Sequence, residues 1–403
     1  MMHMVAHTGD DADERRGGKT RRAESGKAGR VREGAAVLMS ALLAAGAAAA
    51  EAAGKPDLRG QRLVCMGDSI TDGFSYPLLV KQALEEARVP APTLICAGIG
   101  GDTAAGMEKR LERDVFAHKP TLVTLNAGIN DVLRKVKPAE YEASVTHIAA
   151  EMKARGIPLL LLTTSVLGAK QAEADARLAE FNAALRALAR REGYRVADVN
   201  DLMQKARAAG TEAMEEDHVH PNYQGHRIMA RALLDALGYA DVPVPAEMKV
   251  SLMPGIVREW KLRAVAGKAT PLDDAAAAAL QADATWTAYS LPETEAVANN
   301  WWLEQERKRG LAVTLEKALG KAPVYEGLAA IEAAQAKTAY LNTGAALQSV
   351  WLNGKRVYAA GEEWKGWHPG RERMPVELRA GRNTLVIRTG NAFFLSITDD
   401  NTW

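Results

Sequence analysis

A serine that directly follows a short apolar run is the first residue whose setting could support chemistry. Residues 63–66 are apolar, Gly67-Asp68-Ser69 follows them, and a segment with helical periodicity begins near Tyr76. A strand that turns sharply through a serine into a helix leaves that serine at the carboxyl edge of a sheet, where open α/β folds carry out their chemistry. Ser69 is therefore the candidate nucleophile, although Asp-Ser is also a common turn pair.

Asp217 and His220 are the residues that could activate this serine. A serine hydroxyl is a weak nucleophile alone and requires a base that is itself oriented by a third group. The two residues lie three positions apart, just before a helical pattern, so the carboxylate can accept from Nδ1–H while Nε2 faces Ser69. His218 is a local competitor, and a His218/His220 pair could instead chelate a metal. No third ligand cluster accompanies this pair, so we predict no metal site.

Two further loops could bind a developing oxyanion. Gly101 lies in a glycine-rich loop after residues 94–96, and its backbone N–H could face the oxyanion with no side chain in the way of the substrate. This loop could instead be a phosphate cradle, but its dinucleotide fingerprint is only partial and no Gly-Lys-Ser/Thr occurs. Asn130 follows residues 122–125 and could donate its side-chain N–H₂, or it could be an ordinary turn residue. We interpret Asp131 as structural, a cap of the segment that follows it.

Four short motifs occur in a fixed order along residues 61–238. They are Gly-Asp-Ser, Gly-Gly-Asp-Thr, Gly-Ile-Asn-Asp and Asp-x-x-His-Pro-Asn. In this order they resemble the SGNH (GDSL) hydrolase family of esterases and lipases. The resemblance implies that Ser69 is the nucleophile, and that the amides of Ser69 and Gly101 with the side chain of Asn130 form the oxyanion hole. The family usually has Asn where this chain has Cys96.

The elements that must position these residues follow from an alternation of apolar runs with helical patterns over residues 58–240. This alternation is typical of a parallel sheet covered on both faces. We predict a five-stranded flavodoxin-like sheet, in which right-handed crossovers bring the ends of the first three strands together. The predicted strands are 63–66, 94–96, 122–125, 158–162 and 194–199, and helices are predicted at 76–88 and 223–237, among others.

The second half of the chain differs in composition. All eight Trp residues lie beyond the Val-Pro-Val-Pro sequence at 242–245. We predict a linker and helical connector at 241–283, helical over 257–283, and a small β-sandwich at 284–403. Asn353-Gly354 is the strongest hairpin signal in the chain.

The sandwich region resembles the galactose-binding-like jelly rolls that are attached to carbohydrate-active enzymes. This resemblance depends on the runs at 350–354, 375–378 and 381–385. Trp364 and Trp367 could form a platform on which a sugar stacks. Alternatively, both belong to the core or to a domain contact.

The amino-terminal region predicts export. Residues 1–33 are polar and basic, so we predict disorder. Residues 34–52 are predicted to be a signal peptide, because an uncharged Ala-rich run follows the basic residues. That run is shorter than the roughly 20 strongly apolar residues of a membrane span, so no stable membrane insertion is expected after cleavage. A later start codon or an uncleaved anchor is the alternative.

The overall composition excludes some partners. A net charge of +1 on 403 residues gives no reason to expect nucleic acid or an anionic membrane as partner. Cys65 and Cys96 fall in neighbouring predicted strands, so a disulfide is conceivable in an exported protein, while a buried free thiol is commoner. No cofactor is expected.

These observations predict a secreted or periplasmic serine esterase that hydrolyses carboxylic esters through an acyl-enzyme. A small ester or an acetylated polysaccharide is the expected substrate, with removal of acetyl groups from carbohydrate as the expected reaction. A lipase or lysophospholipase of the same family is the first alternative. A carbohydrate-binding protein with an inactive hydrolase domain is the second.

Overall fold

The computed structural model describes residues 55–266, 272–291, 296–298, 309–313, 315–362 and 365–399. The segment predicted to be disordered, the predicted signal peptide and Trp364 lie outside these residues. The chain divides into the units Met1–Pro56 and Asp57–Trp403. All helices and strands named below belong to the second unit.

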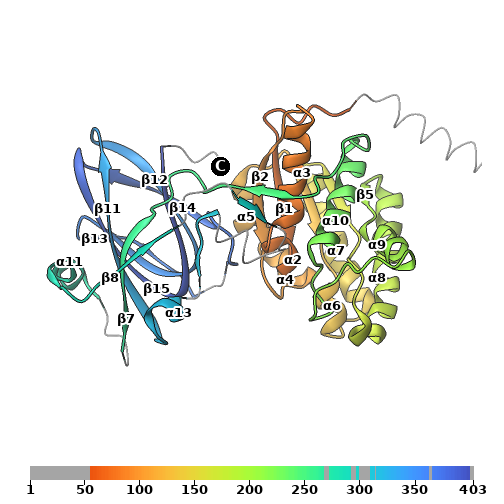
Figure 1. Cartoon of the computed structure of the whole chain (residues 1–403). Helices are drawn as coiled ribbons and strands as arrows, with labels where there is room; N and C mark the ends of the chain where they lie inside the picture. Colours follow the sequence, from red (N-terminus) through yellow and green to blue (C-terminus); the bar gives the residue numbers. More distant parts are fainter. Residues whose placement is uncertain are drawn as a thin grey trace, which may run out of the picture. The chain divides into compact units, whose positions relative to one another are not determined.

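A five-stranded parallel sheet forms the first domain (Figure 1). The strand order β2-β1-β3-β4-β5 is that of flavodoxin-like folds, so the predicted fold is confirmed. The strands are apolar runs because helices cover both faces of the sheet. They are β1 (Arg62–Gly67), β2 (Thr93–Gly98), β3 (Leu122–Asn126), β4 (Leu159–Leu162) and β5 (Arg195–Ala197).

The helices of this domain fall into two packed groups. In one group α10 contacts α3 and α9, and in the other α7 contacts α4 and α8. Two short helices, α2 and α6, begin just beyond the carboxyl ends of β1 and β3, where the candidate site residues lie. The helices are α2 (Ser69–Asp72), α3 (Ser75–Glu86), α4 (Ala104–Lys109), α5 (Leu111–Asp114), α6 (Ile129–Leu133), α7 (Pro138–Ala154), α8 (Ala172–Glu192), α9 (Val199–Ala208) and α10 (Tyr223–Leu237).

An antiparallel eight-stranded sheet forms the predicted β-sandwich. Its order is β13-β12-β15-β11-β7-β8, and β14 and β10 pair in addition with β12 and β15. The long strands β12 and β15 therefore each pair with several neighbours. The strands are β7 (Glu259–Val265), β8 (Thr287–Ser290), β10 (Ala312–Val313), β11 (Val324–Ala333), β12 (Lys337–Leu352), β13 (Lys355–Ala359), β14 (Glu372–Leu378) and β15 (Gly381–Thr398).

The connector between the two sheets differs from the prediction. The predicted helix over 257–283 is wrong at Glu259–Val265, which forms β7 and pairs with β11 and β8. The reason is an alternation of buried Trp260 and Leu262 with more exposed neighbours, which suits a strand with one buried face. Within the predicted helix, an α-helix forms at α11 (Asp274–Ala279).

Three smaller features complete the description. The hairpin predicted at Asn353-Gly354 is confirmed, since β12 and β13 pair and both turn residues have positive φ. Cys65 and Cys96 lie opposite each other on β1 and β2, and no disulfide joins them. Among the described residues, we find no helix that combines the length and the apolar character needed to span a bilayer.

Candidate active site

The turn after β1 exposes the predicted nucleophile. Asp68 is the N-cap of α2, and its carboxylate accepts a hydrogen bond from the Ile70 amide at 3.0 Å. This cap fixes the start of the helix, so that Ser69 becomes its first residue at the carboxyl edge of the sheet. The sharp turn places the serine hydroxyl on the edge that the other motif loops also reach.

The structure brings together the three residues predicted to form the catalytic machinery. Ser69 Oγ lies 2.8 Å from His220 Nε2, and His220 Nδ1 lies 2.6 Å from Asp217 Oδ2. The other carboxylate oxygen of Asp217 accepts from the amides of Val219 and His220. Partial desolvation raises the pKa of Asp217, but these backbone and imidazole hydrogen bonds outweigh it and lower that pKa below its usual value. The carboxylate therefore stays ionised and orients the imidazole.

Contacts of neighbouring residues hold the loop that carries His220. Asn222 caps α10 by accepting from the Gly225 amide at 3.0 Å, and Pro221 forms an isolated bridge with Met214. His218, the competing base, packs against Gly168 instead. A Cβ placed on that glycine would lie only 2.3 Å from Nδ1 of the His218 ring. The base that faces the serine is thus His220.

Both predicted oxyanion loops adjoin the nucleophile turn. A Cβ placed on Gly100 would lie 3.9 Å from the Ser69 Cβ, so the Gly101 loop runs against the serine. Asn130, on α6, donates from Nδ2 to Asp68 Oδ2 at 3.3 Å. Because an amide NH₂ has two hydrogens, this bond leaves a second N–H that can point at an oxyanion. The structure thus brings the Gly101 loop and Asn130 to the nucleophile turn, and the oxyanion hole stays a prediction.

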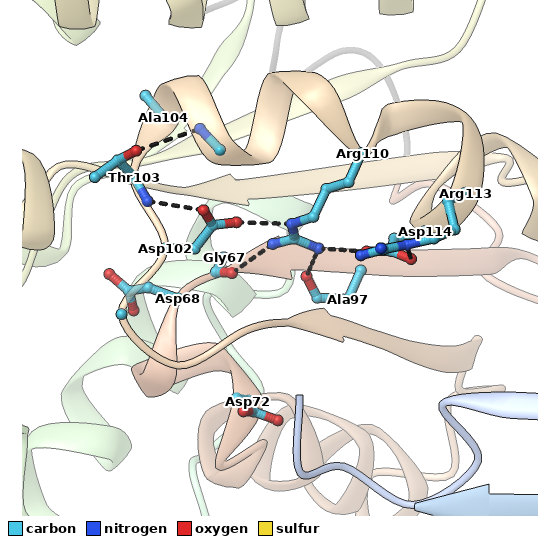
Figure 2. A network of polar contacts seen from close by, with 12 residues as sticks. Gly67, Asp68, Asp72, Ala97, Asp102, Thr103, Ala104, Arg110, Arg113 and Asp114 are labelled. Atoms are coloured by element: carbon cyan, nitrogen blue, oxygen red, sulfur yellow. Dashed lines mark hydrogen bonds and ion pairs between the residues drawn. The ribbon is translucent and has the colours of Figure 1, made fainter. Parts of the chain in front are cut away.

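A buried arginine lies beside Asp102, at the end of the loop that contains Gly101 (Figure 2). Arg110, whose side chain is 7% exposed, donates to the carbonyl oxygens of Gly67 and Ala97 at 2.9 and 2.8 Å. It also forms ion pairs with Asp102 at 2.7 Å and Asp114 at 3.0 Å. One guanidinium therefore joins the ends of β1 and β2 to the end of the loop that contains Gly101. Sequence reasoning missed it, although a charge between the apolar Met107 and Leu111 positions was the available signal.

Aspartates of the motifs bind backbone amides of neighbouring loops. Asp131 accepts from the Ala104 amide, the first of α4, at 3.1 and 3.2 Å, while Thr103 is the N-cap of that helix. The prediction that Asp131 caps the segment after it is therefore wrong. Asp72, which the sequence analysis did not single out, accepts from the Gly100 amide at 3.3 Å. Burial raises the pKa of Asp68 to about 7 and that of Asp131 to about 6. The loops that carry the oxyanion donors are thus cross-linked by carboxylates.

The thiol at the position where the family has Asn also contacts this region. Cys96 Sγ lies 3.4 Å from the carbonyl oxygen of Thr71 on α2. The partly buried thiol is therefore a weak donor to the nucleophile helix.

Of the two tryptophans that could form a sugar-stacking platform, the structure describes Trp367. Trp364 lies outside the described residues. The ring of Trp367 packs against the buried cluster of Leu311, Ala345, Ala392 and Phe394. Its backbone amide donates to Asp72. These contacts favour the alternative in which Trp367 belongs to a domain contact.

Comparison with known proteins extends this picture. Residues 65–228 match the model of the GDSL-like Lipase/Acylhydrolase family. The chain is 27% identical over 215 residues to an acetylxylan esterase of Geobacillus stearothermophilus, covering 45% of this chain and 95% of the relative. It is 33% identical over 109 residues to the esterase TesA of Pseudomonas aeruginosa, covering 25% and 53%.

Solved structures include similar chains. A crystal structure of an acetylxylan esterase from Geobacillus stearothermophilus is 26% identical, covers 45% of this chain and 97% of its own, and has a TM-score of 0.42. An alpha/beta hydrolase enzyme from the metagenome of Lake Arreo, Spain, is 29% identical with the same coverages and the same TM-score. The family match and the esterase relatives support the SGNH (GDSL) hydrolase family and a carboxylic ester hydrolase.

Proposed function

We propose that this carboxylic ester hydrolase works through an acyl-enzyme on Ser69 and removes acetyl groups from carbohydrate outside the cytoplasm. The observation that carries the mechanism is the hydrogen-bonded series from Ser69 through His220 to Asp217. The acetylxylan esterase relative, of which this chain covers 95%, supports an acetylated carbohydrate as substrate. The basic segment followed by the Ala-rich run at 34–52 supports export.

The first half-reaction forms the acyl-enzyme. Ser69 Oγ attacks the ester carbonyl while its proton moves to His220 Nε2, and Asp217 stabilises the imidazolium that results. The amides of Ser69 and Gly101 and the side chain of Asn130 donate to the oxyanion. The tetrahedral intermediate then breaks its bond to the alcohol oxygen, which takes the proton from His220 and leaves.

The second half-reaction releases the acid. His220 takes a proton from water, whose oxygen attacks the acyl carbonyl through a second tetrahedral intermediate at the same oxyanion donors. Collapse of this intermediate breaks the bond to Ser69 Oγ, which recovers its proton from His220. No step requires a group beyond those of the chain, the ester and water.

Exposure of the catalytic residues suits a large alcohol part. The side chains of His220 and Asp217 are 23% and 49% exposed, so the histidine loop lies at the surface. A glycan that is much larger than its acetyl group can reach such a serine without entering a deep channel. The triad geometry sets the reaction, and this exposure favours a polymeric substrate over a free lipid.

A substrate panel tests the proposal. We expect kcat/KM to be highest for acetyl esters, on both acetylated xylo-oligosaccharides and aryl esters, and to fall at least about tenfold as the acyl chain grows to hexanoyl. Ser69→Ala should abolish hydrolysis and labelling by a fluorophosphonate. A steep rise of activity with acyl length would instead identify a lipase. Sugar binding by a wild-type protein that neither hydrolyses esters nor labels would favour the inactive carbohydrate-binding alternative.

A further inference from the structure

A loop of the sandwich contacts the helix that begins with Ser69. The backbone amides of Trp367 and His368 donate to Asp72 Oδ1 at 3.0 and 3.1 Å, and His368 Nδ1 lies 3.2 Å from the same oxygen. The side chains of Asp72 and His368 are 5% and 8% exposed. In Figure 2, Asp72 lies apart from the Arg110 network, beside a blue segment of the carboxy-terminal region. This contact lies in a buried setting, where a hydrogen bond to a carboxylate is strong.

The same carboxylate reaches the oxyanion loop. Asp72 is the last residue of α2, and its Oδ2 accepts from the Gly100 amide at 3.3 Å. Helix α2 also packs directly on the end of β2, because a Cβ on Gly98 would lie 2.1 Å from the Asp72 nitrogen. Asp72 therefore links three parts of the chain: the nucleophile helix, the loop that carries Gly101, and the sandwich loop.

The sandwich loop approaches so closely that only glycine fits at its tip. Gly366 has φ +88°, and a Cβ there would lie 2.7 Å from the Gly98 carbonyl oxygen and 3.1 Å from Asp72 Oδ1. A side chain at this position would meet a left-handed backbone penalty and would also displace the contact. The position thus offers a single substitution that separates the two surfaces.

A second interpretation of this cluster is a cation site. Asp72, Cys96 and His368 each offer a ligand atom, and these atoms lie within 4.8 Å of one another. However, the Asp72 carboxylate already accepts from the amides of Gly100, Trp367 and His368. Ligation of a metal would have to compete with these bonds. The contacts therefore favour a hydrogen-bonded junction.

We propose that the sandwich loop at residues 366–368 positions the oxyanion hole through Asp72. By fixing the carboxylate, the loop fixes the Gly100 amide and with it the orientation of the Gly101 N–H beside Ser69. Gly366, His368 and Asp72 are positioning residues in this scheme, and the sandwich is part of the catalytic apparatus. The inference rests on the proposed acyl-enzyme function.

The first test compares two glycine substitutions in the sandwich. Gly366→Ala separates the loop from Asp72, whereas Gly381→Ala is the matched control, with φ +79° and nothing within 4 Å of an added Cβ. A fluorophosphonate titrates the concentration of reactive Ser69, and the turnover of an aryl acetate is divided by this concentration. A loss of folded protein then does not lower the measured kcat. Because a deleted oxyanion donor costs about 10²–10³ in kcat, we expect a displaced one to cost about tenfold in Gly366→Ala, with KM changed less than about twofold. Gly381→Ala should match wild type.

Inhibition by phenylboronic acid adds a readout that a purely structural role would not move. The boronic acid forms a tetrahedral adduct with Ser69 that uses the oxyanion donors. We therefore expect the Ki of phenylboronic acid to rise about tenfold in Gly366→Ala and to stay unchanged in Gly381→Ala. Asp72→Asn, which places an N–H₂ opposite the backbone donors, should give a similar loss. The double variant Asp72→Asn/Gly366→Ala should be no worse than Asp72→Asn alone, because both remove the same link.

The outcomes separate the two proposals. Equal kcat and Ki in Gly366→Ala and Gly381→Ala, or losses that multiply in the double variant, would overturn the inference while wild type remains an active esterase. A wild-type protein that is neither titrated nor active would overturn the proposed function itself. If Gly366→Ala fails to fold, Asp72→Asn compared with wild type decides the case by the same two measurements.

Discussion

At the scale of single residues, the aspartates of the motifs act mainly on backbone amides. Four aspartates each accept a hydrogen bond from a backbone amide in a loop of the site or at the start of a helix that follows one. They are Asp68, Asp72, Asp102 and Asp131. Asp217 differs from these four because its carboxylate also binds the imidazole of His220. The backbone of the candidate site is therefore held by hydrogen bonds from its amides to these carboxyl groups.

Asn130→Ala tests the side-chain donor of the oxyanion hole. We expect kcat to fall by about 10²–10³ with KM nearly unchanged, because the donor binds the transition state more tightly than the ground state. Steady-state kinetics on an aryl acetate measures both constants. Asn200→Ala on α9 is the control and should behave as wild type. A rise in KM at constant kcat would show that Asn130 binds substrate and not the oxyanion.

Asp68→Asn tests the buried carboxylate beside Asn130. Burial raises the pKa of Asp68 from 3.8 to about 7, against the opposing hydrogen bond from the Ile70 amide. A carboxyl whose folded pKa is raised contributes stability that is complete below its unfolded pKa and is lost as the pH rises through the folded value. Between about pH 5 and pH 8 we therefore expect the unfolding free energy of Asp68→Asn to gain about 2 kcal/mol relative to wild type.

Urea unfolding at several pH values measures this difference. Asp57→Asn, at an exposed position, is the control and should follow the wild-type pH dependence. Parallel curves for Asp68→Asn and wild type would show that the buried carboxyl titrates equally in the folded and unfolded chains.

At the scale of elements, Arg110 connects α4 and α5 to the ends of β1 and β2. Its guanidinium donates to Gly67, Ala97, Asp102 and Asp114 while 7% exposed. Arg110→Lys keeps the charge, but a single ammonium lacks the planar fork that reaches these acceptors. We expect the variant to lose about 2–4 kcal/mol of unfolding free energy, because buried acceptors remain unpaired.

The neighbouring arginine provides the comparison for this prediction. Arg113 also pairs with Asp114, but its side chain is 29% exposed. Arg113→Lys should therefore cost less than about 1 kcal/mol, as is usual for solvent-exposed ion pairs. Equal losses in the two variants, measured by urea unfolding, would show that burial of Arg110 contributes nothing.

The elements also show where sequence reasoning succeeds and where it stops. Strands β1, β2 and β3 are predictable because each contains a short apolar run and is followed by a motif. Strands β12 and β15 are harder to predict because polar residues inside them resemble turn residues. Asn342 is such a residue, and it is fully buried and bonds across the sheet to Ser396 and Thr398. A buried polar side chain whose hydrogen-bond partners lie on another strand leaves no periodic pattern in the sequence.

The candidate site, like the fold, could be predicted from the sequence only in part. The triad and the oxyanion residues lie in motifs whose spacing the fold itself explains. The partners of Asp72 and Arg110 lie in other motifs or in the sandwich, and nothing local to either residue indicates which backbone groups the folded chain brings to it. The sequence therefore predicts the candidate catalytic residues but does not indicate the tertiary contacts that Asp72 and Arg110 make.

At the scale of the whole molecule, the segment after the first domain contacts both that domain and the sandwich. Gln82 on α3 bonds to the backbone of Glu247 and Lys249. Further along, the Met253 amide donates to the Arg309 carbonyl, and Ile256 pairs with Ser396 in an isolated bridge. The segment at 247–256 is therefore bound at both ends and does not behave as a free linker.

These contacts predict that the two sheets unfold together. All eight Trp residues lie beyond position 245, so tryptophan emission reports on the carboxy-terminal part, whereas esterase activity reports on the first domain. If the segment at 247–256 and the Asp72 junction couple the two parts, emission and activity should be lost at one urea midpoint in wild type, as coincident probes of a cooperative transition. In Gly366→Ala the two midpoints should separate, with emission changing first, because the sandwich loses a contact with the larger core. Separate midpoints already in wild type would show that the sheets are independent folding units.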